Sequence, residues 1–357
     1  MPRQQRPSHL RLILTQPWKL VRSIYHTSAL GVSVFLDRLL LPFACRAVDF
    51  RTQLYRCYLG GFLANFWDLL FKAPLNLKKS RYADEKLGGV PCVIIPRDAA
   101  AALQESKHQD ITTQGQQQKP LILLYAHGGG YAFGEPLMYI ETYERWIRRA
   151  KEQGLKLVVV SVDYSGSIHG ITSPLSPDLQ QVMDDVLTIS TGLIDEAKFP
   201  ACRNDFVNVY RSLVEDFHVN PALIVFGGDS AGGGLTAMSA LEIRRQGLSA
   251  PGGIILISPW VDLEMAHTLH SPAITTDFLI TFSQDNPILV NSFLPEGMKA
   301  NDPRVSPVFD NLHSLPPQLI LAGTAEVLLP DSLTWARRSK QAGNKVEFIL
   351  ERGQMHM

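Results

Sequence analysis

A serine between glycines is the strongest candidate nucleophile in the sequence. Ser230 stands in Gly228-Asp229-Ser230-Ala231-Gly232, directly after the apolar run 223–226 and directly before a helix-like stretch. A G-x-S-x-G on a sharp strand-to-helix turn projects the serine hydroxyl from the edge of a sheet, and the glycines avoid collisions between neighbouring backbones. The helix N-terminus at this point favours developing negative charge. We therefore predict a nucleophilic Ser230; the alternative is a glycine-rich turn without chemistry.

A second glycine-rich segment supplies hydrogen-bond donors for such a nucleophile. The segment His127-Gly128-Gly129-Gly130 follows the apolar run 121–126. Glycine amides can approach a substrate oxygen without interference from side chains, and with the N–H of Ala231 they would form an oxyanion hole. We assign Gly128, Gly129 and Ala231 to this hole, and we expect His127 to stiffen the loop. A phosphate-binding loop is the weaker interpretation, because neither G-x-x-x-x-G-K-[ST] nor G-x-G-x-x-G is present.

A serine hydroxyl needs a histidine base, and the base needs a carboxylate that orients it. In the architecture of a G-x-S-x-G elbow the chain order is serine, acid, histidine. The acid is expected just after the strand candidate 318–322, where Glu326 stands, and His356 is the one histidine beyond it. This order selects Glu326 and His356. The other histidines that follow Ser230 are His267, His270 and His313.

Two further acids have structural interpretations. Asp331 follows Pro330 and precedes an amphipathic stretch, which is typical of an N-cap or first-turn residue, so we prefer Glu326 as the acid. Asp229, inside the elbow, is interpreted as a structural carboxylate.

The elements that must position these residues alternate between short apolar runs and amphipathic stretches. This pattern is typical of a mostly parallel sheet with crossover helices, that is, an α/β fold. A polar stretch at 104–119 is predicted to be a loop between the first two strands. The predicted strands are 90–95, 121–126, 157–162, 223–226, 253–258, 318–322 and 345–350, and the predicted helices are 138–153, 177–193, 205–217, 231–245 and 331–342.

Composition excludes several classes of partner. The 357 residues are 45% hydrophobic and 19% charged, with 34 basic and 34 acidic side chains, so no net charge attracts nucleic acid. The four cysteines are scattered without the spacing of a zinc site, and we expect no metal and reduced thiols in an intracellular protein.

The N-terminal region has a different character from the rest. No acid occurs before Asp37, and the basic residues in this stretch are Arg3, Arg6, Arg11, Lys19 and Arg22. A transit peptide, a membrane-surface segment and a solvated basic tail are all consistent with this pattern. The apolar stretch 29–44 contains Asp37 and Arg38, so no membrane-spanning helix is predicted there, and a further apolar run covers 59–71. We divide the chain into a helical cap or membrane-associated segment, 1–85, and a catalytic domain, 86–357.

The motifs HGGG and GDSAGG, with the late acid and histidine, resemble the hormone-sensitive-lipase type of α/β-hydrolase over residues 121–356. Val162-Asp163-Tyr164 and the segment 257–262 (ISPWVD) are further matches. The sequence around Asp163-Tyr164-Ser165, a glutamate in place of the usual aspartate at Glu326, and Met355-His356 make the chain most similar to the fungal branch that includes steryl acetyl hydrolases. The resemblance implies an α/β-hydrolase fold with helices on both faces of the sheet and an N-terminal helical cap. It also implies a cofactor-independent esterase or deacetylase with the triad Ser230, His356 and Glu326. The substrate would be a small hydrophobic ester, a short acyl group on a sterol, terpenoid or other natural product, which suggests lipid metabolism or secondary metabolite biosynthesis.

In the same branch an apolar N-terminal segment associates with the endoplasmic reticulum membrane, and residues 1–75 match that role. Members of the family usually continue after the histidine into a final helix, whereas this sequence stops at Met357. The His356 loop is therefore expected to lack an anchor. A weakly active or inactive protein that binds a small molecule, and an acyltransferase with the same triad, are the alternatives.

Overall fold

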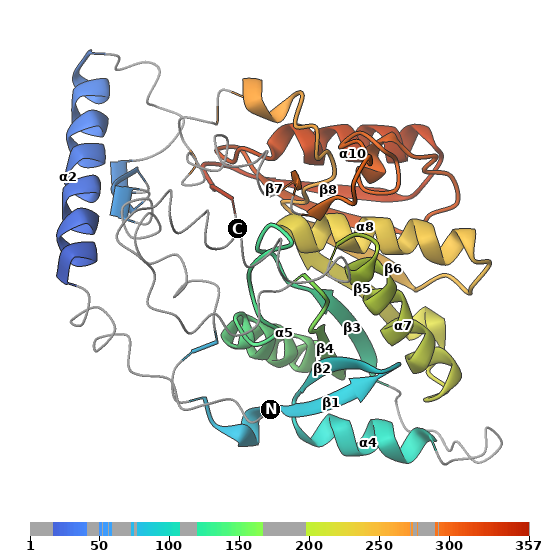
Figure 1. The fold of residues 1–357 in the computed structure, drawn as a ribbon. Helices are drawn as coiled ribbons and strands as arrows, with labels where there is room; N and C mark the ends of the chain where they lie inside the picture. Colours follow the sequence, from blue (N-terminus) through green and yellow to red (C-terminus); the bar gives the residue numbers. More distant parts are fainter. Residues whose placement is uncertain are drawn as a thin grey trace.

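An eight-stranded sheet forms the centre of the computed structural model, which describes residues 17–40, 50–51, 53–55, 57–58, 73–74, 77–107, 120–166, 198–271, 273, 277, 290–291 and 293–356 (Figure 1). The strands lie in the order β1-β2-β4-β3-β5-β6-β7-β8. Their bounds are β1 Ala83–Leu87, β2 Val90–Ile95, β3 Leu121–Ala126, β4 Leu157–Val162, β5 Ile224–Asp229, β6 Gly253–Ile257, β7 Gln318–Gly323 and β8 Val346–Glu351.

The direction of the strands places the chemistry at one edge of the sheet. β1 and β2 pair antiparallel, and β2 also runs antiparallel to β4, whereas every pairing from β4 to β8 is parallel. The carboxyl ends of β3, β5, β6, β7 and β8 therefore meet at one edge. The loops that carry the predicted site residues all leave from that edge.

Helices cover both faces of this sheet, as predicted for an α/β fold. The described helices are α2 Pro17–Leu40, α4 Asp98–Lys107, α5 Ile140–Glu152, α7 Ala201–Glu215, α8 Ser230–Arg245 and α10 Leu329–Gln341, with short 3₁₀ turns at Lys79–Arg81, Pro221–Leu223, Thr268–His270 and Pro307–Phe309. Successive residues of a strand point to opposite faces. In β3, Ile122 and Leu124 belong to the core beneath α7 and α8, whereas Leu123 and Tyr125 belong to a second core beneath α5.

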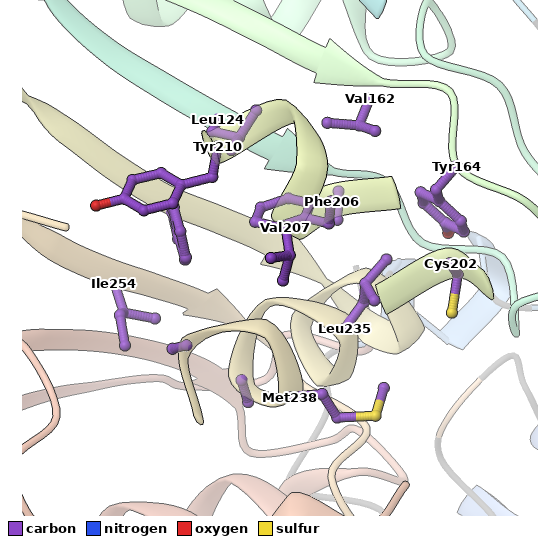
Figure 2. Packing of buried hydrophobic residues seen from close by; sticks show 14 of the residues in the cluster. Leu124, Val162, Tyr164, Cys202, Phe206, Val207, Tyr210, Leu235, Met238 and Ile254 are labelled. Atoms are coloured by element: carbon purple, nitrogen blue, oxygen red, sulfur yellow. The ribbon is translucent and has the colours of Figure 1, made fainter. Parts of the chain in front are cut away.

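The larger core packs α7 and α8 against the sheet (Figure 2). Phe206 and Tyr210 of α7 each meet Phe226 of β5 edge to face, with ring centroids 5.0 Å and 4.9 Å apart. Leu235 and Met238 of α8 are buried in the same core. This packing fixes α8, the helix that begins at Ser230.

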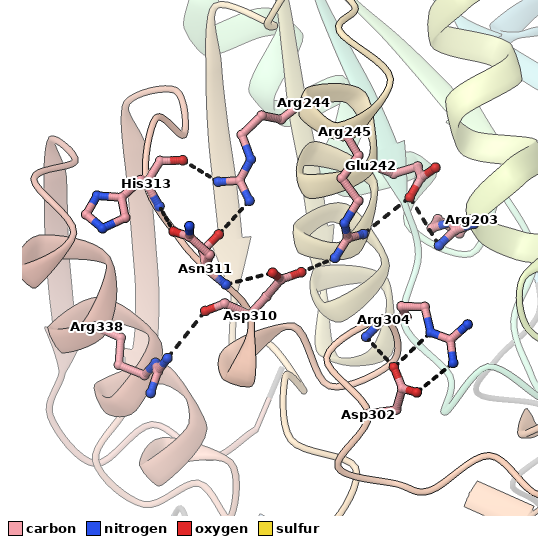
Figure 3. A network of polar contacts seen from close by, with 10 residues as sticks. All are labelled: Arg203, Glu242, Arg244, Arg245, Asp302, Arg304, Asp310, Asn311, His313 and Arg338. Atoms are coloured by element: carbon pink, nitrogen blue, oxygen red, sulfur yellow. Dashed lines mark hydrogen bonds and ion pairs between the residues drawn. The ribbon is translucent and has the colours of Figure 1, made fainter.

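Polar contacts fix the other end of α8 (Figure 3). Arg244 donates to the backbone carbonyls of Asn311 and His313, and Arg245 pairs with Asp310. Glu242 pairs with Arg203 of α7 at 3.3 Å. α8 is therefore held at its C-terminal turn by α7 and by the loop that precedes β7.

The predicted strands agree closely with the structure, and three of them, β2, β3 and β4, agree to the residue. β1 is a strand that the sequence patterns did not reveal. The stretch 104–119, predicted to be a loop, begins inside α4, which ends at Lys107; its remainder lies outside the described residues, as do the predicted helix 177–193 and the apolar run 59–71. The division at residue 86 falls within β1 and stays a prediction.

Helix α2 stands at one side of the molecule, away from the sheet (Figure 1). Trp18, Tyr25, Val32 and Leu39 recur at every seventh position and have exposed fractions of 77%, 68%, 59% and 66%. The opposite side of the helix contains the buried residues Ser23 and Val34. In the part of the chain that is described, no helix is long and apolar enough to cross a bilayer.

Candidate active site

Ser230 lies on a strained turn between β5 and α8. It is the first residue of α8, directly after the last residue of β5, and its φ of +54° lies in the left-handed region that non-glycine residues rarely adopt. A Cβ added at Gly228 would overlap the carbonyl oxygen of Gly232, and one added at Gly232 would overlap that of Ala126. The two glycines are therefore required by close backbone approach, which is the geometry of a nucleophile elbow.

The glycine loop after β3 lies directly beside this turn. A Cβ added at Gly128 would lie 3.2 Å from the Cβ of Ser230. Gly129 and Gly130 have φ values of +122° and +64°, so the loop turns sharply over the elbow. Neither amide has an acceptor among the described residues, and the Ala231 amide lies in the first turn of α8, where helix N–H groups lack partners.

One of the three amides assigned to the oxyanion hole has an acceptor within the protein. The Gly128 N–H donates to Asp229 Oδ1 at 3.0 Å, so this amide is already used within the protein. The amide of Gly130, which we did not assign from the sequence, is the one that remains open beside Gly129. The sequence shows three successive glycines, and it could not show which of their amides donates to Asp229.

Asp229 joins the elbow to the glycine loop. Its carboxylate accepts from the hydroxyl of Tyr125 at 2.9 Å and from that of Tyr139 at 2.7 Å, in addition to the amide of Gly128. Burial raises the pKa of this carboxyl to about 6, against the lowering effect of these three donors. The contacts agree with the structural interpretation of Asp229.

The side chain of His127 contacts its own loop and the ring of Tyr164. Its side chain is buried, and Nδ1 lies 2.8 Å from the carbonyl oxygen of Gly128. The Tyr164 hydroxyl donates to the His127 carbonyl at 2.6 Å, and the two rings stack with centroids 4.5 Å apart. These contacts stiffen the loop, as expected.

Glu326 occupies the turn after β7 and is fully buried. The Ser258 hydroxyl donates to Oε2 at 2.5 Å, while Oε1 has no hydrogen-bond partner among the described residues. Burial raises the pKa of Glu326 to about 8; the nearby acids Asp277 and Asp331 add to this, and Ser258 opposes it.

Asp331, the rival acid, has both carboxylate oxygens engaged. Oδ2 accepts from the amides of Val261 and Asp262, each at 2.9 Å, and Oδ1 accepts from the Thr268 hydroxyl at 2.7 Å. Burial raises its pKa to about 7. Asp331 therefore holds the loop after β6, which leaves Glu326 as the acid with a free oxygen.

His356 follows β8 on a loop that pairs with the loop of Glu326. The Ala325 N–H donates to the Gln354 carbonyl at 2.9 Å, and the side chains of Ala325 and Met355 form a small buried cluster. His356 is buried, its Nδ1 has no partner in the described part of the chain, and burial lowers its pKa to about 4. The structure thus brings the acid and histidine loops together, but it does not form the expected hydrogen bond between Glu326 and His356.

A segment after β6 also contacts the site, and sequence reasoning gave it no role. The backbone N–H of Trp260 donates to the Ser230 carbonyl at 2.8 Å, while the Ser258 hydroxyl donates to the carboxylate of Glu326. The signal in the sequence was a serine at the end of the predicted strand 253–258, whose carboxyl end lies at the same sheet edge. No cluster of three or more potential metal ligands occurs in the described ranges, and the described cysteines Cys57, Cys92 and Cys202 are buried and form no disulfide with one another.

Comparison with known proteins agrees with this geometry. Residues 193–357 match the family described as alpha/beta hydrolase fold. An acetyl-hydrolase of Streptomyces hygroscopicus is 30% identical over 209 residues, which cover 57% of this chain and 68% of that protein. An esterase of Acinetobacter venetianus is 29% identical over 199 residues, or 53% of this chain and 62% of that protein. The chain therefore matches about two thirds of the length of these relatives or somewhat less.

Solved structures extend the likeness over most of the chain. A hormone-sensitive lipase from a metagenome library is 27% identical, with a TM-score of 0.59 over 90% of this chain and 88% of that one. The hormone-sensitive-lipase homologue EstE7, also from a metagenome library, is 27% identical, with a TM-score of 0.61 over 86% of this chain and 88% of that one. This protein belongs to the α/β-hydrolase family, and its structural neighbours are esterases of the hormone-sensitive-lipase type, as the motifs predicted.

Proposed function

We propose that this protein is a serine carboxylic ester hydrolase that works through an acyl-enzyme. The observation that carries the proposal is Ser230 on a left-handed turn at the start of α8, beside a glycine loop with unused amides. The relatives named esterase and acetyl-hydrolase support the same reaction class.

In the proposed reaction Ser230 Oγ attacks the ester carbonyl carbon, and His356 takes the hydroxyl proton. The amides of Gly129, Gly130 and Ala231 stabilise the oxyanion. The tetrahedral intermediate releases the alcohol, which takes its proton from His356, and leaves the acyl group on Ser230. A water molecule, deprotonated by His356, then attacks the acyl-enzyme and releases the carboxylic acid.

Glu326 orients His356 in this scheme. Its unpartnered Oε1 and the unpartnered Nδ1 of His356 are complementary groups on paired loops, and a buried polar atom without a partner is costly. We propose that the two atoms form a hydrogen bond during turnover. That contact favours the charged carboxylate and the charged imidazole together, against the effect of burial on each.

For the substrate we propose a short acyl ester of a lipophilic alcohol, of the sterol, terpenoid or natural-product kind. The acetyl-hydrolase relative supports a short acyl group. Next to the glycine loop, Tyr131 stacks on Phe293 with centroids 4.1 Å apart, and Phe293 meets Phe199 at 6.0 Å. These rings make the surroundings of the loop apolar, which favours a hydrophobic alcohol.

Glu326 Oε1 and His356 Nδ1 are not hydrogen-bonded to each other in the structure. This favours a second candidate, a small-molecule binding protein with weak or no turnover. A fluorophosphonate probe distinguishes the two, because it reacts only with an activated serine. The hydrolase proposal predicts labelling of the wild-type protein at Ser230, mapped by peptide mass spectrometry, and no labelling of Ser230→Ala. An unlabelled, folded wild-type protein would favour the binding protein. Product analysis with an added alcohol would reveal an acyltransferase.

We further propose that the outer stripe of α2, formed by Trp18, Tyr25, Val32 and Leu39, lies on an anionic membrane surface. An exposed apolar stripe of this length marks an interaction site, and the aromatic residues suit the boundary between headgroups and acyl chains. The acid-free, basic sequence before Asp37 complements anionic headgroups.

Vesicle flotation of the full chain tests this membrane proposal. We expect flotation with phosphatidylserine-containing vesicles, reduced flotation with neutral vesicles, and loss of flotation in the double variant Trp18→Ala/Tyr25→Ala. Thr27→Ala, on the opposite side of the helix, is the matched control. A wild-type protein that remains unbound, or that forms a dimer through α2 instead, would contradict the proposal.

A further inference from the structure

The three residues after β6 contact both the nucleophile and the acid of the site. The backbone N–H of Trp260 donates to the Ser230 carbonyl at 2.8 Å, and the Ser258 hydroxyl donates to Glu326 Oε2 at 2.5 Å. A Cβ added at Gly233, in the first turn of α8, would lie 2.9 Å from the Cβ of Pro259. The segment 258–260 therefore fills the space between the elbow and the turn after β7.

Ser258 is held in an unusual backbone conformation at this position. Its φ is +45°, its side chain is buried, and its N–H donates to the Leu321 carbonyl of β7 at 2.8 Å. A non-glycine residue in the left-handed region has a conformational cost that a glycine would not incur. The hydroxyl on Glu326 is the contact that a glycine here would lose.

Glu326 needs such a contact because a glutamate side chain has one more rotatable bond than an aspartate and loses more conformational freedom when it is fixed. The titratable groups that act on it are Asp277 and Asp331, which disfavour its ionised form. His356 lies on the loop that pairs with the loop of Glu326. Ser258 and the Gly323 backbone favour the ionised form. With Oε2 held by Ser258, Oε1 is the oxygen left for His356.

We propose that Ser258 is a positioning residue, whose hydroxyl holds one oxygen of Glu326 so that the other, in its ionised form, can accept from His356. The inference rests on the proposed hydrolase function and adds a residue to it. Ser258 touches neither the substrate nor the reacting atoms in this role; it acts through the acid.

The test compares the same substitution at two serines with the same backbone conformation. Ser258→Gly removes the hydroxyl and relieves the left-handed φ, so folding should be retained. Ser314→Gly is the matched control, because Ser314 also has a positive φ, +59°, but is exposed and lies before β7, away from the site. Ser258→Ala is a second variant that keeps the Cβ, and thermal unfolding checks that each protein is folded.

Steady-state hydrolysis of p-nitrophenyl acetate across pH is the measurement. For Ser258→Gly we expect kcat to fall about tenfold or more, a fraction of the roughly 10² to 10⁴ that general acid–base catalysis supplies, with KM changed by less than about twofold. Loss of the donor disfavours the Glu326 carboxylate, so the acidic limb of the pH profile should move to higher pH. Ser314→Gly should match the wild type in both respects.

Unchanged kcat and an unchanged pH profile in folded Ser258→Gly and Ser258→Ala would overturn this role and leave the hydrolase function intact. An equal loss of activity at every pH, without a shift of the acidic limb, would also overturn it, since that result indicates a merely structural serine. A wild-type protein without Ser230-dependent turnover would instead overturn the proposed function, and this role with it.

Discussion

At the scale of single residues, the buried carboxylates of this protein fall into two kinds. Asp229 and Asp331 have both oxygens engaged by donors and hold loops together, whereas Glu326 keeps one oxygen without a partner. Their sequence neighbourhoods suggested this division, because Asp331 follows a helix-starting proline and Glu326 follows a strand. The sequence did not show that the Gly128 amide is bonded to Asp229, because the amides of three successive glycines are equivalent in sequence.

Asp229 makes the stability of the protein depend on pH. Its pKa is raised from 3.8 to about 6, so between these values the native protein holds a proton that the unfolded chain has already lost. Its contribution to stability therefore falls as pH rises from about 4 to about 6. Asp229→Asn removes this dependence and can still accept from Tyr125 and Gly128. We expect the wild type to lose about 2 kcal/mol relative to this variant between pH 4 and pH 7.

Urea unfolding of the wild type and of Asp229→Asn at the two pH values measures this difference. A stability difference that is the same at pH 4 and pH 7 would show that Asp229 has an ordinary pKa. The three donors to this carboxylate would then fully offset the effect of burial on its pKa.

At the scale of elements, the parallel strands were predicted well because each is a continuous apolar run between turn signals. β1, Ala83–Leu87, lies at the edge of the sheet, and in its first four residues half-buried and exposed side chains alternate. Its sequence, ADEKL, contains too few apolar residues for the strand to be recognised. α4 was not predicted for a similar reason, because its second half, QESK, is polar. Edge elements are specified by their partners more than by their own sequence.

The elbow between β5 and α8 depends on the absence of a side chain at Gly232. A Cβ there would overlap the carbonyl oxygens of Ala126 and His127, and backbone atoms of a central strand cannot move away cheaply. We expect Gly232→Ala to lower the free energy of unfolding by about 2 kcal/mol or more. It should also abolish labelling of Ser230 by a fluorophosphonate.

Gly253→Ala in β6 is the control, because its Cβ would lie 3.4 Å from the nearest atom, the Pro317 carbonyl oxygen. Urea unfolding should place this variant within about 1 kcal/mol of the wild type. Equal stability losses in the two variants would mean that the elbow is not constrained as described.

At the scale of the whole molecule, the sheet gathers loops that are far apart in the sequence. Residues 128, 230, 258, 326 and 356 follow five different strands, and parallel pairing brings all five strand ends to one edge. The order of the motifs was enough to predict this gathering. The sequence could not predict that Glu326 and His356 form no hydrogen bond in the structure, because this contact depends on side-chain torsions at the ends of two loops.

The most direct test of the account is the hydrolysis of p-nitrophenyl acetate by the 357-residue protein beside its Ser230→Ala variant. We expect turnover by the wild type and a loss of several orders of magnitude in kcat in the variant, up to about 10⁶, since the nucleophile and its base act as a unit. Equal activity in the two folded proteins, or no turnover in either, would contradict the assignment of Ser230 as the nucleophile of an ester hydrolase.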